Sequence, residues 1–295
     1  MGTSVYIFYI LVLALFLSVF FVSFRILSRI RLLSAVCDRW RFVRWGVSVI
    51  VAVFVLLGAL NFYVYHGLGD QPDIFRKGDP SKLWVAITFD DGPSPIWTPR
   101  ILHVLNEYKV PATFFMVGAH VVSYPDVALR VAVEGHELGN HTFDHINIPS
   151  TSTAELSSQL LRTTWAIYDA TGQMPTFFRP PRGMYDTRIR RLAELLGQPI
   201  VLWTVSGQDW LPGTTVEQIV KRVVSQTKAG DILLFHDSGA LIANQGANRE
   251  STVRALPAII EGIRKKGFEF VSLDQLLQYA EPIELTEQEM LELRE

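Results

Sequence analysis

The sequence has almost no cysteine and lacks the short motifs that identify several large enzyme classes. Cys37 is the single cysteine among 295 residues, so no disulfide can form within the chain. No G-x-G-x-x-G or Walker A sequence is present, which argues against the usual dinucleotide and P-loop nucleotide sites. The segments that end predicted strands contain no serine or cysteine nucleophile motif either. The chemistry must therefore be sought in carboxylate, imidazole and guanidinium groups.

The sequence also lacks an excess of charge of one sign. Its 27 Lys and Arg nearly balance 29 Asp and Glu, for a net charge of −2. Residues 1–66 contain six Arg and one Asp, a charge of +5, so the remainder has a charge of −7. A mildly acidic domain is poorly suited to a phosphate backbone, and we expect no nucleic-acid partner. The sequence identifies no protein partner.

Apolar residues, 49% of the chain, are concentrated near the N-terminus. Two uncharged runs, 5–24 and 47–65, are each long enough as a helix to span the roughly 30 Å hydrocarbon core of a bilayer. A signal peptide is the alternative for the first run, but its leading residues contain no Lys or Arg. The loop 25–46 is rich in Arg, which predicts a cytoplasmic position. These features predict a two-pass transmembrane hairpin over residues 1–66, with the rest of the chain on the extracellular side of the cell membrane.

The remainder of the chain alternates between strand and helix patterns. Residues 67–82 are rich in Gly, Pro and Asp, which is typical of a linker, and residues 281–295 form an acidic tail. Ser152 and Thr214 are predicted to begin helices. Within the domain, residues 83–280, strands are expected at 83–89, 113–117, 177–179, 200–205, 232–235 and 268–272. This alternation predicts a parallel α/β sheet or barrel.

Two adjacent carboxylates, Asp90 and Asp91, follow the first of these strands. Parallel α/β folds place their sites at such strand ends, although Asp-Asp-Gly-Pro can also be only a turn. His141 and His145 are spaced so that a helical turn would place both imidazoles on one face; one core and one surface His is the alternative. Together these four residues predict an open metal site with one carboxylate left over as a base, which suits metal-assisted hydrolysis.

Side chains that could take part in catalysis or substrate binding lie at three further strand ends. Arg179 begins a rigid Arg-Pro-Pro segment and can pair with a buried carboxylate; a surface Arg in a loop is the alternative. Asp209 and Trp210 follow the strand 200–205, where Trp210 can stack on a sugar or simply pack. His236 follows the strand 232–235, and a His with a carboxylate partner can serve as a general acid.

Taken in order, these segments resemble the motifs of the NodB-homology polysaccharide deacetylases, carbohydrate esterase family four. The resemblance covers residues 83–279 and implies a distorted (β/α) barrel of about seven strands, with its groove at the strand C-termini. The five matching segments are Thr88–Pro93, His141–His145, Arg179–Pro181, Asp209-Trp210 and Leu234–His236.

The resemblance implies a divalent metal ion held by Asp91, His141 and His145. Zinc is expected, with cobalt or another divalent ion as the alternative. Asp90 would be the base for the attacking water, and His236 would protonate the leaving amine. The products would be acetate and a free amino sugar.

The resemblance also implies supporting roles for five other residues. Arg179 would orient Asp90, and Asp209 would orient His236. A backbone N–H at Arg182 would assist at the oxyanion. Trp210 and Leu234 would lie on the substrate side of the site.

Two positions depart from the family pattern. The third motif often has an aromatic residue where this chain has Arg182, a change that favours an anionic substrate, and the fourth often begins with Asp where this chain has Ser206. The sequence thus predicts a membrane-anchored deacetylase of a cell-envelope N-acetylhexosamine polymer, with peptidoglycan favoured. The alternatives are a lipid-linked sugar as substrate and a non-catalytic glycan-binding or scaffolding barrel. A glycoside hydrolase using two carboxylates would leave His141 and His145 without a role.

Overall fold

The computed structural model describes residues 18–23, 25–26, 39–66, 74–239 and 247–278. The chain divides into two compact units, Met1–Asp70 and Gln71–Glu295, and each is described by itself. The acidic tail predicted at 281–295 lies outside the described residues.

The first unit contains the helix α3 (Arg39–His66). Within the described ranges, no helix is both long enough and apolar enough to cross a membrane. The predicted transmembrane hairpin is therefore wrong, and the two-span membrane association that depended on it has no support. The prediction considered the uncharged run 47–65 alone, whereas the helix that contains this run begins at Arg39 and includes further Arg residues in its first turns. The other predicted span, 5–24, lies mostly outside the described residues.

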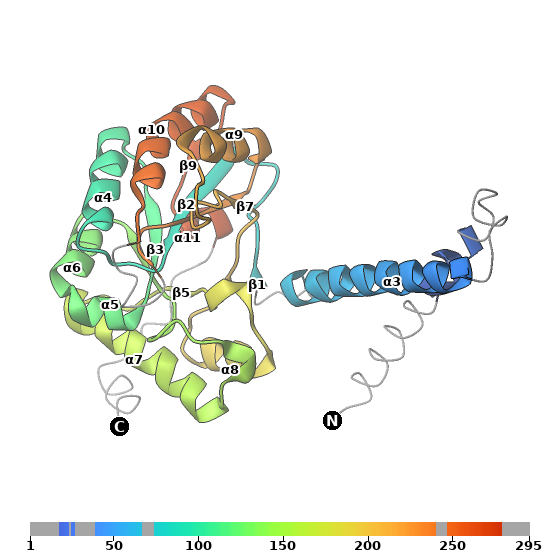
Figure 1. Ribbon diagram of the computed structural model, residues 1–295. Coiled ribbons are helices and arrows are strands. Elements are labelled where there is room, and N and C mark those ends of the chain that lie inside the picture. The colour runs from blue at the N-terminus through green and yellow to red at the C-terminus, as the bar shows by residue number, and fades with distance from the viewer. Residues whose placement is uncertain (1–17, 24, 27–38, 67–73, 240–246, 279–295) are drawn as a thin grey trace. The chain divides into compact units, whose positions relative to one another are not determined.

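The second unit is built on one curled parallel sheet (Figure 1). Its strands follow the order β1-β6-β5-β4-β3-β2-β8-β7, with β9 paired to β2. The strands are β1 (Ile74–Phe75), β2 (Trp84–Asp90), β3 (Ala112–Met116), β4 (Glu137–Asn140), β5 (Phe177–Phe178), β6 (Ile200–Val201), β7 (Val205–Ser206), β8 (Ile232–His236) and β9 (Glu269–Phe270).

The sheet curls because one extended segment of the chain, which contains β6 and β7, forms strand pairs near both ends of the sheet. β6 pairs with β1 and β5 near one end, and β7, which begins four residues after β6 ends, pairs with β8 at the other. No pairing between β1 and β7 is found in the described part of the chain, so the sheet is a half-barrel that stays open between them. The predicted parallel (β/α) architecture thus fits, although the sequence pattern predicts neither β1 nor β4.

Helices connect most of the successive strands and cover the outside of the curled sheet (Figure 1). The Ser152 side chain accepts a hydrogen bond from the Glu155 N–H at the start of α7, as predicted, whereas α9 is capped by Thr215 rather than Thr214. The helices are α4 (Trp97–Tyr108), α5 (Gly118–Ser123), α6 (Pro125–Val133), α7 (Thr153–Thr171), α8 (Thr187–Leu195), α9 (Val216–Gln226), α10 (Glu250–Lys265) and α11 (Leu273–Leu277), with 3-10 turns η1 (Ile148–Ser150) and η2 (Pro181–Gly183).

Side chains alternate along the central strands, so that one face of the sheet packs into the main apolar core and the other face carries candidate site residues. Val85, Ile87 and Phe89 of β2 join the large apolar cluster beneath the helices, whereas Ala86 joins a smaller cluster on the opposite side of the sheet. Because side chains alternate with a period of two, Asp90 falls on the side of Ala86, inside the curl. β2 and β8 are in register so that Asp90 lies beside His236. The pleat therefore places both at the carboxyl edge of the sheet.

Candidate active site

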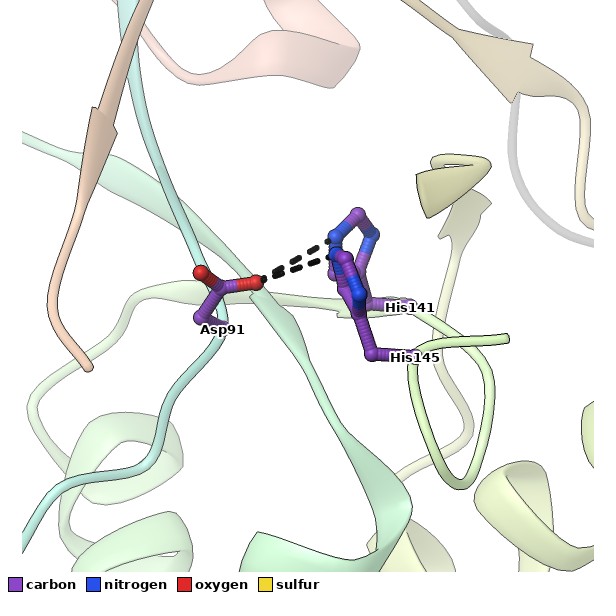
Figure 2. A group of neighbouring side chains, drawn as sticks. All are labelled: Asp91, His141 and His145. Carbon is purple, nitrogen blue, oxygen red and sulfur yellow. Dashed lines mark ion pairs between the residues drawn. The ribbon is translucent and has the colours of Figure 1, made fainter. Parts of the chain in front are cut away.

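Asp91, His141 and His145 meet at the carboxyl edge of the sheet, and all three are buried. Asp91 follows β2, and both histidines follow β4. Oδ1 of Asp91 lies 3.6 Å from Nε2 of His141 and 3.5 Å from Nε2 of His145. Figure 2 shows the two rings directed at this single carboxylate oxygen. One carboxylate and two imidazoles thus converge on a common point.

This donor set fits a divalent metal ion. Zinc ligands at about 2.0–2.2 Å and at tetrahedral angles lie about 3.4 Å from one another, close to the 3.5 and 3.6 Å separations found here. Oδ1 of Asp91 is buried and has no hydrogen-bond partner among the described residues. Since a buried carboxylate oxygen normally has a partner, a bound cation would satisfy it.

The protonation states of the two histidines also suit metal binding. Burial lowers the pKa of His141 and of His145 to about 3, so both rings are neutral near pH 7. Nδ1 of His141 lies 2.7 Å from the Arg179 carbonyl oxygen. A carbonyl only accepts, so Nδ1 must hold the proton and donate, which leaves the Nε2 lone pair free for an ion. Burial raises the pKa of Asp91 to about 6, with the nearby Asp90 charge adding to the effect. A cation would favour the ionised carboxylate.

The two histidines do not lie on a helical turn, which corrects that part of the prediction. They belong to a loop after β4, in which Thr142 has a φ of 65° and His145 a φ of 50°. Asp91, with a φ of 77°, is also in the left-handed region. Such backbone conformations are costly for residues other than Gly, and they concentrate at functional sites. Here the irregular backbone, rather than helical periodicity, brings the rings together, with centroids 5.1 Å apart.

Asp90 is the second carboxylate of the centre and is held by Arg179. Its Oδ1 accepts a 2.7 Å hydrogen bond from Nη1 of Arg179, and its Oδ2 lies 3.8 Å from Nε2 of His141. The Arg179 side chain is fully buried, and its Nε and Nη2 donate to the carbonyls of Val201 and Leu202. Burial raises the pKa of Asp90, and the Arg179 charge opposes this. Asp90 is therefore a buried carboxylate with an elevated pKa, and the surface alternative for Arg179 does not hold.

His236 and Asp209 form a hydrogen-bonded pair on the other side of Asp90. Oδ1 of Asp209 accepts a 2.9 Å bond from Nδ1 of His236, and Oδ2 accepts from the His236 backbone N–H. Burial opposes the charged ring, but the Asp209 carboxylate outweighs burial and raises the pKa of His236 to about 9. His236 is thus cationic near pH 7 and able to donate a proton.

Thr252 of α10 and Arg249, the residue just before α10, hold Asp209 in turn. Oγ1 of Thr252 donates a 2.8 Å hydrogen bond to Oδ2 of Asp209, and Nη1 of Arg249 lies 3.4 Å from its backbone oxygen. Both side chains are buried. No pattern in the sequence identifies Thr252 or Arg249, because they are about 40 positions from Asp209 along the chain.

The three residues predicted on the substrate side occupy different environments. Trp210 is 53% exposed, whereas Leu234 is only 3% exposed and precedes His236 by two residues on the same face of β8. Arg182 is exposed in η2, with a φ of 59°. Its charge helps to lower the pKa of both His141 and His145, after burial and other nearby charges. Arg182 is therefore an exposed residue near enough for its charge to act on both histidines. The individual roles assigned to all three residues stay predictions.

Sequence reasoning missed two residues that support Asp91. Nδ1 of His120 lies 2.6 Å from the Asp91 carbonyl oxygen, a contact that nothing in the sequence indicates. Asp237 packs under the same turn, and a Cβ added to Gly92 would come within 2.1 Å of its Oδ2. That oxygen accepts a 2.6 Å hydrogen bond from Thr98, so only Gly fits above it. The position of Asp237 directly after His236 was the available signal.

Titration of His236 provides a direct check of this arrangement. In chelator-treated protein, we expect the His236 ring to titrate at about 9, measured by NMR of its ring nitrogens. In Asp209→Asn the main charge that favours the imidazolium is lost while burial persists, so the His236 pKa should fall below its ordinary value of about 6.5. The raised pKa of His236 also makes the stability of the wild-type protein depend on pH. Its stabilising contribution to the free energy of unfolding is fully present below about pH 6.5 and is lost as the pH rises through about 9.

A His236 pKa that is the same in both proteins would refute the pairing. Asp186→Asn is the matched control, because Asp186 is an acid that caps α8 and makes no contact with His236.

Known proteins that are similar to this chain are polysaccharide deacetylases. Residues 77–201 match the family model of the polysaccharide deacetylases. The chain is 39% identical over 198 residues to a peptidoglycan-N-acetylglucosamine deacetylase of Bacillus cereus, an alignment that covers 66% of this chain and 88% of that protein. It is 36% identical to a chitooligosaccharide deacetylase of a Bradyrhizobium species, over 65% of this chain and 90% of that protein.

Solved structures with the same fold include both active and inactive proteins. A peptidoglycan N-acetylglucosamine deacetylase in complex with an N-hydroxybenzamide superimposes with a TM-score of 0.65 at 32% identity, covering 71% of this chain and 95% of that one. A pseudoenzyme of carbohydrate esterase family four from Bacillus anthracis superimposes with a TM-score of 0.63 at 28% identity, covering 70% and 69%. The fold alone therefore does not establish catalysis, and the side chains must be considered.

Proposed function

Because this chain belongs to the polysaccharide deacetylase family, and is therefore a hydrolase of N-acetyl groups, we propose that it deacetylates peptidoglycan with a bound divalent metal ion. Zinc is the proposed ion, because two neutral imidazoles and one carboxylate are a typical catalytic zinc set. The observation that supports this proposal is the convergence of Asp91, His141 and His145, with Asp90 on one side of them.

In the proposed mechanism two side chains, Asp90 and His236, each transfer one proton. When bound, the ion would act as a Lewis acid toward the acetyl carbonyl oxygen. Asp90, whose pKa burial raises, takes a proton from the attacking water. His236, with a pKa of about 9, donates a proton to the leaving nitrogen as the amide bond breaks. The Arg182 backbone N–H is proposed to support the developing oxyanion. The products are acetate and an amino sugar.

The charge at the mouth of the centre supports an anionic polymer as substrate. Arg182 is exposed, whereas Arg179 and Arg249 are buried and engaged by other groups. A free guanidinium beside the acetyl site would attract the carboxylates of peptidoglycan, which a plain N-acetylglucosamine oligomer lacks. This substrate would place the second unit of the chain outside the cytoplasm.

The non-catalytic alternative is less consistent with the site. A family pseudoenzyme shows that the fold can exist without activity. Here, however, Asp90 and the three candidate ligands are buried close together, and the half-buried His236 lies beside Asp90. A scaffold has no need for a base with a raised pKa beside a cation site.

Acetate release from the full-length chain tests the proposal. We expect acetate from purified peptidoglycan and, more slowly, from N-acetylglucosamine oligomers. Chelation should lower the rate by about 10²–10³-fold, since metal ions supply several kcal/mol of transition-state stabilisation, and one equivalent of zinc should restore it. Zinc content measured on the purified protein provides a reading that does not depend on turnover. The proposal fails if acetate is absent with every glycan at full zinc occupancy. Shortened glycan chains would indicate glycoside hydrolysis, and activity confined to a lipid-linked sugar would change the substrate.

A further inference from the structure

The two candidate histidine ligands are held in different ways. Nδ1 of His141 lies 2.7 Å from the Arg179 carbonyl oxygen, and this contact fixes its ring. Nδ1 of His145 is buried but has no hydrogen-bond partner among the residues that the structure describes. A histidine that binds a metal ion usually donates from its second ring nitrogen, and that bond orients the ring. The orientation of His145 must therefore come from the backbone that carries it.

The backbone before His145 is irregular and needs support from outside its own loop. Thr142 has a φ of 65° and His145 a φ of 50°, conformations that persist only when the surrounding structure holds them. The first two N–H groups of α5 donate to the carbonyl oxygens of Thr142 and Phe143, at 3.1 and 3.0 Å. These two bonds hold the middle of the loop but end two residues before His145.

The side chain of Gln159, on α7, holds the residue directly before His145. Gln159 is buried, and its Oε1 accepts a 2.8 Å hydrogen bond from the backbone N–H of Asp144. Its Nε2 donates to Oδ2 of Asp144 at 2.8 Å and to Oε1 of Glu155 at 2.9 Å. Because ionised carboxylates only accept, the amide nitrogen must face them and the amide oxygen must face the N–H. One buried amide thus binds both the backbone and the side chain of Asp144.

From these contacts we propose that Gln159 is a positioning residue for the metal centre. It acts through Asp144 on His145 and would not itself bind the ion. Without the Gln159 bonds, the His145 ring would no longer be held with its Nε2 3.5 Å from Oδ1 of Asp91. This inference rests on the proposed function, because it assumes that the centre binds a divalent ion. It adds that a side chain of α7, outside the catalytic groups, sets the affinity for that ion.

The zinc affinity of the full-length apoprotein tests this role. Gln159→Met keeps most of the side-chain volume but removes both the donor and the acceptor. We expect the zinc Kd, measured by competition with a chromophoric chelator, to increase about 10–100-fold, the usual cost of losing a group that orients a ligand. Gln218→Met is the matched control, because the Gln218 amide oxygen also accepts a backbone N–H, that of Thr215 before α9. It should leave the zinc Kd unchanged.

A reciprocal exchange separates positioning from a general loss of stability. Gln159→Glu alone places a carboxylate against Asp144 and removes the donor, so we expect weak zinc binding, as in Gln159→Met. In the double variant Gln159→Glu/Asp144→Asn, the introduced carboxylate can accept from the backbone N–H at position 144 and from the introduced amide. Glu155 is exposed and can turn toward solvent. Both bonds to position 144 can therefore form again, and the zinc Kd should return close to that of the wild type.

The outcomes separate this inference from the proposed function. An unchanged zinc Kd in Gln159→Met overturns the positioning role, even if urea unfolding shows a lower stability, since Gln159 would then only support the fold. A double variant that binds zinc as weakly as Gln159→Glu alone overturns it as well, and this comparison applies even if Gln159→Met does not fold. A wild-type protein that binds no zinc would instead overturn the proposed function.

Discussion

Arg179→Met is expected to lower the free energy of unfolding by about 3–5 kcal/mol and to abolish deacetylation. Arg179 is fully buried, and its Nη1 donates to both Asp90 and Thr88, while Nε and Nη2 donate to two backbone carbonyls. Methionine fills much of the same volume but provides no donor, so Asp90 would be left as a buried carboxylate without its partner. Breaking a buried ion pair from one side has this cost, because the remaining charge is neither solvated nor compensated.

Urea unfolding gives the stability, and acetate release gives the activity. Arg188→Met is the matched control, because Arg188 is a half-buried Arg that pairs with Asp186 near the protein surface; it should cost at most about 1 kcal/mol. Arg179→Lys keeps the charge but not the planar fork, and we expect an intermediate loss. If Arg179→Met were as stable as Arg188→Met, Arg179 would not be the group that stabilises buried Asp90.

The sequence predicts the strands whose own side chains are apolar. β2, β3 and β8 fall within or close to their expected ranges, because strands buried on both faces of a parallel sheet have continuous apolar runs. β4 has only one apolar side chain, Leu138, in the sequence Glu-Leu-Gly-Asn. Its extended conformation comes from pairing with β3 and β5 on either side, a tertiary effect that local patterns do not contain.

The apparent strand 200–205 illustrates the same limit. Its first residues pair with β5 and its last with β8, two strands that lie far apart in the order of the sheet. The sequence alternates with a period of two both before and after this change of partner strand, so the pattern does not show where one strand ends and the next begins. Only the pairing within the curled sheet reveals that Leu202 to Thr204 connects two strands.

The residues of the candidate site likewise fall into those that a local sequence motif contains and those that act only through tertiary contacts. Residues that a local motif contains, such as Asp91 and His145, could be predicted, although their backbone geometry could not. Thr252 and His120 act through contacts with residues 43 and 29 positions away. Each lies in a helix whose pattern is already explained by packing against the core, so nothing local distinguishes them. The hairpin prediction failed for a related reason, since an uncharged run does not define the limits of its helix.

Asp90→Asn should leave a folded, metal-binding protein whose kcat is lower by about 10²–10⁴-fold, the usual contribution of a general base. Asparagine keeps an oxygen that can accept from Arg179, so the stability loss should be smaller than in Arg179→Met. The negative charge of Asp90 contributes to the raised pKa of Asp91. Its removal should therefore ease ionisation of Asp91, and zinc binding should be retained or strengthened.

The combination of lost turnover and retained zinc identifies Asp90 as a base rather than a ligand. Zinc content and kcat are measured on the same preparation, so that loss of the ion cannot be mistaken for loss of proton transfer. Asp231→Asn is the matched control, because Asp231 is a buried carboxylate that pairs with Lys77 and immediately precedes β8, at the opposite end of that strand from His236. It should retain both zinc and rate. Full activity in Asp90→Asn would mean that another group accepts the proton. Loss of zinc there would instead make Asp90 a fourth ligand, because its Oδ2 is already 3.8 Å from His141 Nε2.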